Sequence, residues 1–293
     1  GTYEISSDTI LFGDAGYYRK HEARDNKDSI QSADGPTTYD VQSLGLGGRH
    51  RVGDTVIRLV LGYEKLDFDN IGILNNDDRD RTQNAAGLRV TREINNQTRV
   101  YVQGLFNKRD YDLVTNGVNR DSSGYSAVAG LIRSLGKKGR VEGYAGVLSQ
   151  DYDDASFETV TAADFGLKLH WYPAESWKVT GNLNRSLRET TDQGASGYLL
   201  TKLDLQVEKA ISSKVKGYAA YTYGYYDYQG IARKDDYNTV TIGANYQLSR
   251  DLLISGSYSY HDNNSNDEVL NPVPGLSYDY SKNLFLLSLK ARF

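Results

Sequence analysis

The stretch SWKVTGNLNRSLRETTDQGASGYLLTKLDLQVE, residues 176–208, contains two alternating segments joined by a polar one. In the second segment Leu203, Leu205 and Val207 alternate with polar residues, and the first segment repeats this pattern from Trp177 onward. Because successive side chains of a strand point to opposite faces, each segment predicts a strand with one apolar and one polar face. The segment ETTDQGAS between them, residues 189–196, predicts a loop.

The same alternation recurs through the chain, in TRVYVQGLFNKR, NTVTIGANYQL and LLISGSYSY. It also closes the sequence, in NLFLLSLKARF. There the pattern predicts one apolar face, made of Phe285, Leu287, Leu289, Ala291 and Phe293. The opposite face carries Ser288, Lys290 and Arg292. These strands are longer than the five or six residues usual in soluble sheets.

The composition excludes several classes of protein. The mean hydropathy of -0.59 and the lack of any run of about 18 apolar residues exclude a helical membrane protein. The chain has 24 Tyr and 29 Gly but no Cys, which favours aromatic-rich strands and removes thiolate chemistry. A net charge of -4 gives no reason to expect a nucleic-acid partner.

Short polar turns recur about every forty residues, near Gly53, Asn95, Lys137, Ala174, Ser212 and Ser249. Longer polar loops lie about midway between them. Short periplasmic turns, long extracellular loops and strands of about ten residues are typical of outer-membrane barrels. The sequence therefore predicts an all-β, transmembrane, antiparallel up-and-down β-barrel of about 14 strands in the bacterial outer membrane. We expect one domain, residues 1–293, in which residues 1–10 form a periplasmic stretch or plug.

A soluble propeller is the competing architecture, because about forty residues is also the length of a four-stranded blade. Each period here holds two long strands, however, and no blade signature recurs. Aromatic residues near the ends of the expected strands, such as Trp171 and Trp177, also favour the membrane barrel.

Motifs for catalysis and metal binding are weak. Ser259, His261 and Asp262 suggest an acyl-transfer group, but nothing indicates an oxyanion site, so a polar histidine at the barrel rim is the favoured interpretation. Asp262, Asn264 and Asn266 have calcium-loop spacing, yet the glycine and the bidentate glutamate of that motif are missing. We expect no enzyme activity, no metal site and no cofactor.

The polar face predicts a basic lumen, with about thirteen cations against about five anions by strand parity. Arg49 and Arg89 are among the cations, and Glu64, Glu142, Asp164 and Glu208 are among the anions. A basic bore favours anionic solutes, although ion pairing that merely holds the wall is an equal alternative. The predicted pore-lining residues are Arg58, Arg99, Arg109, Arg140, Lys168, Lys178, Arg188, Lys202, Asp204, Lys216 and Lys290.

From about residue 140 onward the sequence resembles a known family. The segments GYAGVLSQDYDDASF, LKLHWYPAESWKVTGNLNRSLRETT, YQGIARKDDYNTVTIGANYQLSRDLLISGSYSYHDNNSN and YDYSKNLFLLSL carry the resemblance. They are similar to outer-membrane β-barrel proteins associated with exopolysaccharide export systems. The resemblance implies secretion of a surface polysaccharide, and it transfers no catalytic residues.

We therefore expect an outer-membrane channel that exports an anionic surface polysaccharide. A passive porin for small anionic solutes is the alternative, and a surface adhesin acting through its loops is a third. The expected partners are outer-membrane lipid and lipopolysaccharide, the polysaccharide or small anion, and periplasmic export components.

Overall fold

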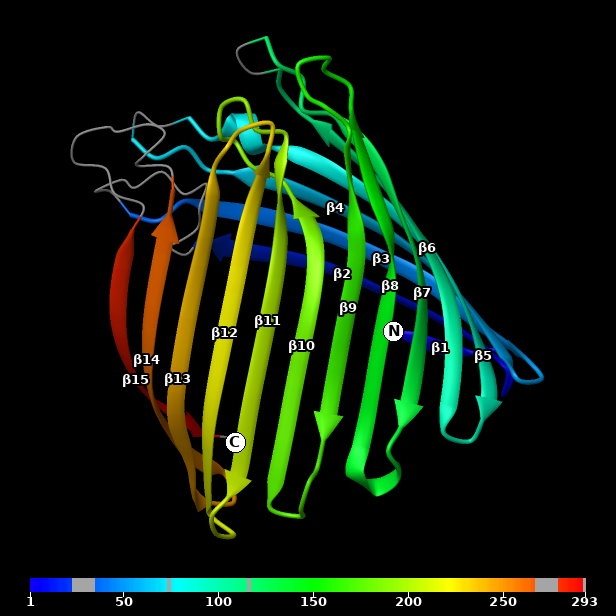
Figure 1. Ribbon diagram of the computed structural model, residues 1–293, viewed down its shortest axis with the longest axis vertical. Coiled ribbons are helices and arrows are strands. Elements are labelled where there is room, and N and C mark those ends of the chain that lie inside the picture. The colour runs from blue at the N-terminus through cyan, green and yellow to red at the C-terminus, as the bar shows by residue number, and fades with distance from the viewer. Residues whose placement is uncertain (23–34, 73–74, 115–116, 267–278, 292–293) are drawn as a thin grey trace. The chain divides into compact units, whose positions relative to one another are not determined.

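Among the described residues, fifteen strands lie in the sheet of the computed structural model, and their order follows the sequence from β1 to β15 (Figure 1). The structure describes residues 1–22, 35–72, 75–114, 117–266 and 279–291. Neighbouring strands run antiparallel, which is the up-and-down arrangement predicted from the sequence.

All strands except the first have 12 to 16 residues. The strand bounds are β1 Thr2–Glu4, β2 Thr9–His21, β3 Thr38–Val52, β4 Thr55–Phe68, β5 Arg81–Asn95, β6 Thr98–Tyr111, β7 Ser122–Ser134, β8 Gly139–Tyr152, β9 Val160–Trp171, β10 Trp177–Arg188, β11 Gly197–Ala210, β12 Val215–Gln229, β13 Lys234–Ser249, β14 Leu252–Ser265 and β15 Tyr280–Ala291. The estimate of about 14 strands therefore holds for the long strands, and the three-residue β1 is the additional one.

Short turns join alternate strand pairs at all six places that the sequence predicts. They occupy residues 53–54, 96–97, 135–138, 172–176, 211–214 and 250–251. Gly53 has a φ of 56°, a left-handed conformation that the two-residue turn after β3 requires and that glycine adopts without steric cost. Longer loops join the other ends of these strands, for example residues 69–80 between β4 and β5.

The helical content is small. Two 3-10 turns, η1 (Asp77–Arg79) and η2 (Gly136–Lys138), occur in these connections. Within the described ranges, no helix has both the length and the apolar character that a membrane crossing needs.

Each long strand has the two faces that the alternation predicts. Residues directly opposite each other in neighbouring strands share a face, so the registers define an apolar face and a polar face of the sheet. On β15, Phe285 and Leu287 are 77% and 79% exposed and lie opposite Tyr258 and Gly256, which belong to the apolar face of β14. Phe293 and Arg292, which the same pattern includes, lie outside the described residues.

Glycines on the polar face make room for aromatic rings from the adjacent strand. An added Cβ on Gly130 would come within 2.3 Å of the ring of Tyr101, and one on Gly224 within 1.9 Å of the ring of Tyr237. A glycine in a strand interior weakens the strand unless close packing requires it. Close packing against a ring therefore accounts for these two glycines. The same packing joins Phe12 to Gly47, Tyr144 to Gly166 and Tyr218 to Gly243.

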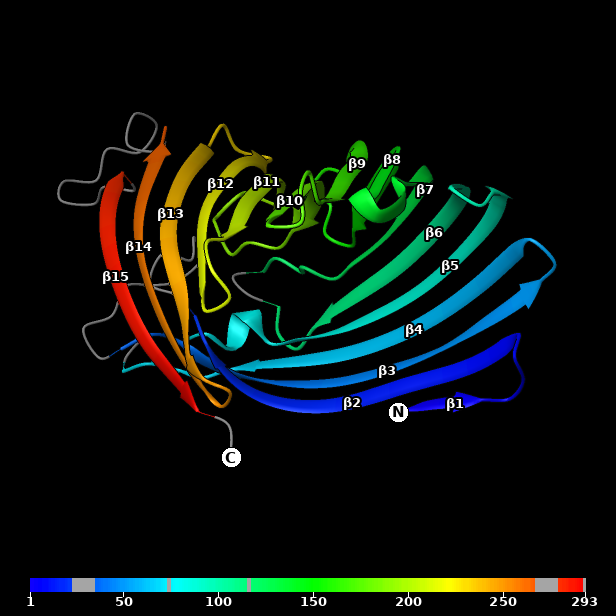
Figure 2. The ribbon, with the colours of Figure 1, turned by 90° about the horizontal axis from the view of Figure 1, so that it is seen from below.

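The chain forms two compact units, which are described separately below. The first comprises residues 1–130, 145–164 and 189–197, and the second comprises residues 131–144, 165–188 and 198–293. Figure 2 shows β1 to β6 of the first unit in their sequence order. The predicted periplasmic stretch, residues 1–10, begins this order, because Thr2–Glu4 pairs with residues 10–12 of β2.

Candidate functional site on the polar face

Three arginines form a row across neighbouring strands of the first unit. Arg49 of β3 lies directly opposite Arg58 of β4, and Arg58 lies opposite Arg89 of β5. On the neighbouring strands, Ile10 of β2 lies opposite Arg49 and Gln103 of β6 lies opposite Arg89. None of these five positions in the described register is an aspartate or a glutamate. Like charges directly opposite each other in a sheet are destabilising. We call Arg49, Arg58 and Arg89 the arginine row.

Aromatic rings and one amide contact two of these guanidinium groups. Arg58 lies 4.8 Å from the centre of the Phe12 ring, and Arg89 lies 4.0 Å from that of Tyr101. The Nε of Arg89 donates a hydrogen bond of 2.7 Å to Oε1 of Gln103. The Nε of Arg49 is buried and has no hydrogen-bond partner among the described residues. The register therefore brings three positively charged side chains together on the polar face of the first unit.

Four of the predicted lining cations are held in ion pairs. Arg109 pairs with Glu189, Arg140 with Glu142 at 2.9 Å, Lys178 with Glu208 at 2.7 Å, and Lys202 with Asp204 at 3.1 Å. For these residues the pairing alternative holds. Asp204 also accepts a hydrogen bond of 2.9 Å from Thr222.

Other predicted lining residues have no ion pair within the described part of the chain. Three of them lie opposite polar residues: Lys168 lies opposite Asn182, Lys216 opposite Asn245, and Arg99 opposite Glu93. The remaining members of this group are Arg58, Arg188 and Lys290.

A clamp on the loop 189–196, which no motif in the sequence predicts, joins this loop to β6. Arg109 and Tyr111, on the polar face of β6, both contact the carboxylate of Glu189, and Tyr111 donates at 2.8 Å. Arg120 donates to three carbonyl oxygens of the loop, those of Thr190, Ala195 and Asp192, at 2.7, 3.1 and 3.3 Å. The loop is therefore held against the polar face of the first unit.

Removing the Arg120 guanidinium should release this loop. Arg120→Ala leaves the carbonyls of Thr190, Asp192 and Ala195 without this donor, and Thr190 and Ala195 are almost fully buried. A buried acceptor that loses its partner costs about 1–3 kcal/mol. We expect amide hydrogen exchange of residues 190–196 to rise by at least about tenfold. Lys108→Ala, on an exposed side chain of β6, is the control, and equal exchange in both variants would contradict the clamp.

A second loop, residues 69–80, is anchored to the first unit by a buried ion pair. Arg79 pairs with Glu22, both side chains are less than a tenth exposed, and the guanidinium lies 4.2 Å from the centre of the Phe68 ring. Next to it, Asp80 accepts a hydrogen bond of 2.6 Å from the amide of Phe68. Burial, together with the charges of Asp67, Asp77 and Asp112, raises the pKa of Asp80 to about 6.

This raised pKa predicts a pH dependence. The folded protein binds the Asp80 proton more tightly than the unfolded chain, whose pKa is near 3.8. The stabilisation is therefore complete below that value and is lost as the pH rises through about 6. Asp80→Asn should flatten the dependence of the thermal midpoint on pH between about 4 and 7. Parallel midpoint curves for the two proteins would rule out this role for Asp80.

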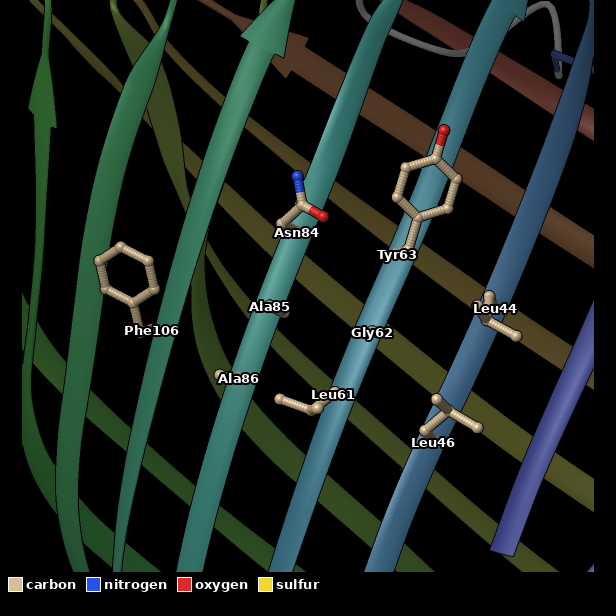
Figure 3. Close-up of a pocket in the computed structure, with 9 residues that line it drawn as sticks. All are labelled: Leu44, Leu46, Leu61, Gly62, Tyr63, Asn84, Ala85, Ala86 and Phe106. Carbon is tan, nitrogen blue, oxygen red and sulfur yellow. The ribbon is translucent and has the colours of Figure 1, made fainter.

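The apolar face of the first unit has a shallow depression of about 380 Å³ between β3, β4, β5 and β6 (Figure 3). Small residues, Gly62, Ala85 and Ala86, lie at its centre, and Leu44, Leu46, Leu61, Tyr63, Asn84 and Phe106 complete its lining. The lining is almost entirely hydrocarbon.

The serine and the histidine considered for catalysis have different hydrogen-bond partners. Ser259 shares a hydrogen bond of 2.8 Å with Thr241, whereas His261 contacts Thr239 at 2.7 Å and Tyr280 at 3.1 Å. Among the described residues, no cluster of His, Asp or Glu side chains is arranged to hold a metal ion. Asp267, where the calcium motif departs from its pattern, lies outside the described residues.

A long-stranded up-and-down sheet with an exposed apolar face and a polar face is the architecture of an outer-membrane β-barrel. The chain belongs to the family described as "Putative beta-barrel porin 2", whose model matches residues 1–293. It is therefore an all-β protein of the outer membrane, and the fold class and location predicted from the sequence are confirmed. No curated protein sequence matches the chain.

Solved structures of two metal transporters and of one outer-membrane receptor share this fold. The FrpB iron transporter from Neisseria meningitidis has a TM-score of 0.59 and 9% identity, over 90% of this chain and 50% of that chain. The copper transporter OprC has a TM-score of 0.53 and 14% identity, over 91% and 51%. The alcaligin outer-membrane receptor FauA from Bordetella pertussis has a TM-score of 0.52 and 10% identity, over 100% and 56%. This chain thus spans about half the length of each, and the likeness concerns the fold alone.

Proposed function

We propose that this chain forms an outer-membrane channel for anionic solutes, and that its principal solute is an anionic surface polysaccharide moving outward. The arginine row carries this proposal. Its three guanidinium groups lie directly opposite one another on the polar face, without an acid in the row. Such an arrangement costs folding free energy, and it attracts negative charge to the same surface.

The geometry of a guanidinium group suits this solute. Its planar fork of donors binds a carboxylate or a phosphate through two hydrogen bonds. A chain of acidic sugars presents such groups repeatedly, so it can pass from one arginine to another. The resemblance to barrels of exopolysaccharide systems supports the outward direction. Membership of a porin family supports transport in general. We propose no catalytic step and no cofactor.

Export also needs contacts on the periplasmic side. Lys137, Lys138 and Arg250 lie in short turns of the second unit, and all three are exposed. We propose that they bind a periplasmic component of the export system through salt-sensitive contacts.

The test compares strains that lack the gene and carry variants of it. Deletion should abolish the surface polysaccharide, and the triple variant Arg49→Gln, Arg58→Gln, Arg89→Gln should fail to restore it. Arg92→Gln, on the apolar face of the same β5 strand, is the control and should restore it fully. Normal polysaccharide in the deletion strain, with slower uptake of a small anionic nutrient, would favour a passive porin instead.

A further inference from the structure

Five aromatic rings from five consecutive strands form a continuous strip in the second unit. These strands, β11 to β15, lie side by side in sequence order (Figure 1). The ring centroids are 5.2 Å apart between Tyr198 and Tyr226, 5.7 Å between Tyr226 and Tyr237, and 5.5 Å both between Tyr237 and His261 and between His261 and Tyr280. This spacing follows the distance between strands. We call these five residues the aromatic strip.

The strip belongs to the polar face. Tyr237 of β13 lies opposite Gly224 of β12, and His261 of β14 lies opposite Thr239 of β13. Thr239 points to the polar face, because the next residue of the strand, Val240, is exposed on the apolar face. Aromatic belts that anchor a barrel in the bilayer lie on the apolar face. A role at the lipid interface therefore does not explain these rings.

The rings are fixed in place and remain partly accessible. Tyr237 packs against Gly224, where an added Cβ would come within 1.9 Å of the ring. His261 is held through both ring nitrogens, by Thr239 at 2.7 Å and by Tyr280 at 3.1 Å. All five rings are half-buried, whereas the neighbouring Tyr228, which Arg233 covers at 4.6 Å, is buried.

We infer that the aromatic strip binds saccharides by stacking against the apolar faces of pyranose rings. A preformed surface of rigid rings gains contact area at a small cost in side-chain entropy. Tyrosine hydroxyls and the imidazole at the edges of the strip supply donors and acceptors for sugar hydroxyl groups. The inference rests on the proposed function in one respect, namely that the polar face lines the channel. It goes further in proposing that the protein recognises the sugar rings of the solute as well as its negative charge.

Saturation-transfer NMR with cellohexaose, an uncharged linear oligosaccharide, tests binding to the detergent-solubilised protein. The wild type should bind, and Tyr226→Ala with Tyr237→Ala should weaken binding by at least about tenfold. The control is Tyr221→Ala with Tyr223→Ala, which removes two rings from the opposite face of β12. Tyr280→Ala, at the first residue of β15, is a milder variant if the double variant does not fold. Tyr226→Phe with Tyr237→Phe keeps the ring faces and should retain most of the binding.

Absence of cellohexaose binding by the wild type would overturn the inference, as would undiminished binding by correctly folded Tyr226/Tyr237 or Tyr280 alanine variants. The probe carries no charge, so its binding is independent of the arginine row. An anion-selective channel that ignores cellohexaose would contradict the aromatic strip alone. Cellohexaose binding by a cation-selective channel would support the strip and contradict the anionic solute.

Discussion

Leu205→Arg should destabilise the folded protein by about 2–4 kcal/mol, because it places a charge near the middle of a strand on the face that contacts lipid. Leu205 lies on β11 opposite Gly181 and is 41% exposed. In a barrel, the backbone N–H and C=O groups are satisfied by hydrogen bonds between neighbouring strands. An arginine side chain that faces lipid at this depth has no comparable hydrogen-bond partner. The free energy of unfolding is measured by denaturant titration in lipid vesicles. The folded fraction at each denaturant concentration is read from an electrophoresis gel, on which the unboiled folded form migrates differently from the unfolded form.

Gln206→Arg is the matched control for this substitution. Gln206 is the next residue of β11, points to the polar face and lies opposite Thr180. The same arginine at this position should change the free energy of unfolding by less than about 0.5 kcal/mol. If Gln206→Arg were the more damaging of the two, the assignment of the faces would be inverted.

Arg233→Ala should cost about 3–5 kcal/mol, since it leaves a buried carboxylate without its cation. Arg233 and Asp235 are 2% and 0% exposed in their side chains, and two guanidinium nitrogens donate to the two carboxylate oxygens at 3.2 and 2.9 Å. The expected result is a large loss in the denaturant midpoint and faster hydrogen exchange in residues 230–236.

The adjacent Lys234 offers a control for the buried pair. Its contact with Asp227 is 3.9 Å long and largely exposed, so Lys234→Ala should cost less than about 1 kcal/mol. Replacing both buried partners, with Arg233→Met and Asp235→Leu, should recover much of the stability because no charge is left unpaired. Equal losses for Arg233→Ala and Lys234→Ala would show that the pair does not hold this end of the second unit.

The regular part of the fold follows from local rules that a sequence displays. A strand of 12 or more residues with period-two alternation shows its faces directly, so the division on β10, β11 and β15 was predicted residue by residue. The six short turns were also predictable, because glycine and small polar residues mark them.

The contacts of the candidate site depend on register and on long-range packing. Strand parity placed Arg49, Arg58 and Arg89 on one face, but only the pairing of β3, β4 and β5 makes them directly opposite. The sequence predicts a loop that contains Glu189, but it does not predict that Glu189 pairs with Arg109, eighty residues away in the sequence. The predicted count of anions on the polar face does not include Glu189 for this reason.

The aromatic strip was missed for a related reason. Its rings are scattered between residues 198 and 280 and have no shared motif. One signal was present: tyrosines recur on the polar parity of these strands near the longer loops, where a solvated wall would carry charged or small residues.

The most direct test is the reversal potential of the purified protein in a planar bilayer across a salt gradient. An anion-selective conductance is the expected result, and the triple variant Arg49→Gln, Arg58→Gln, Arg89→Gln should lower the anion-to-cation permeability ratio several-fold, while Arg92→Gln leaves it unchanged. A cation-selective wild-type channel, or a ratio that does not respond to loss of the arginine row, would contradict the account.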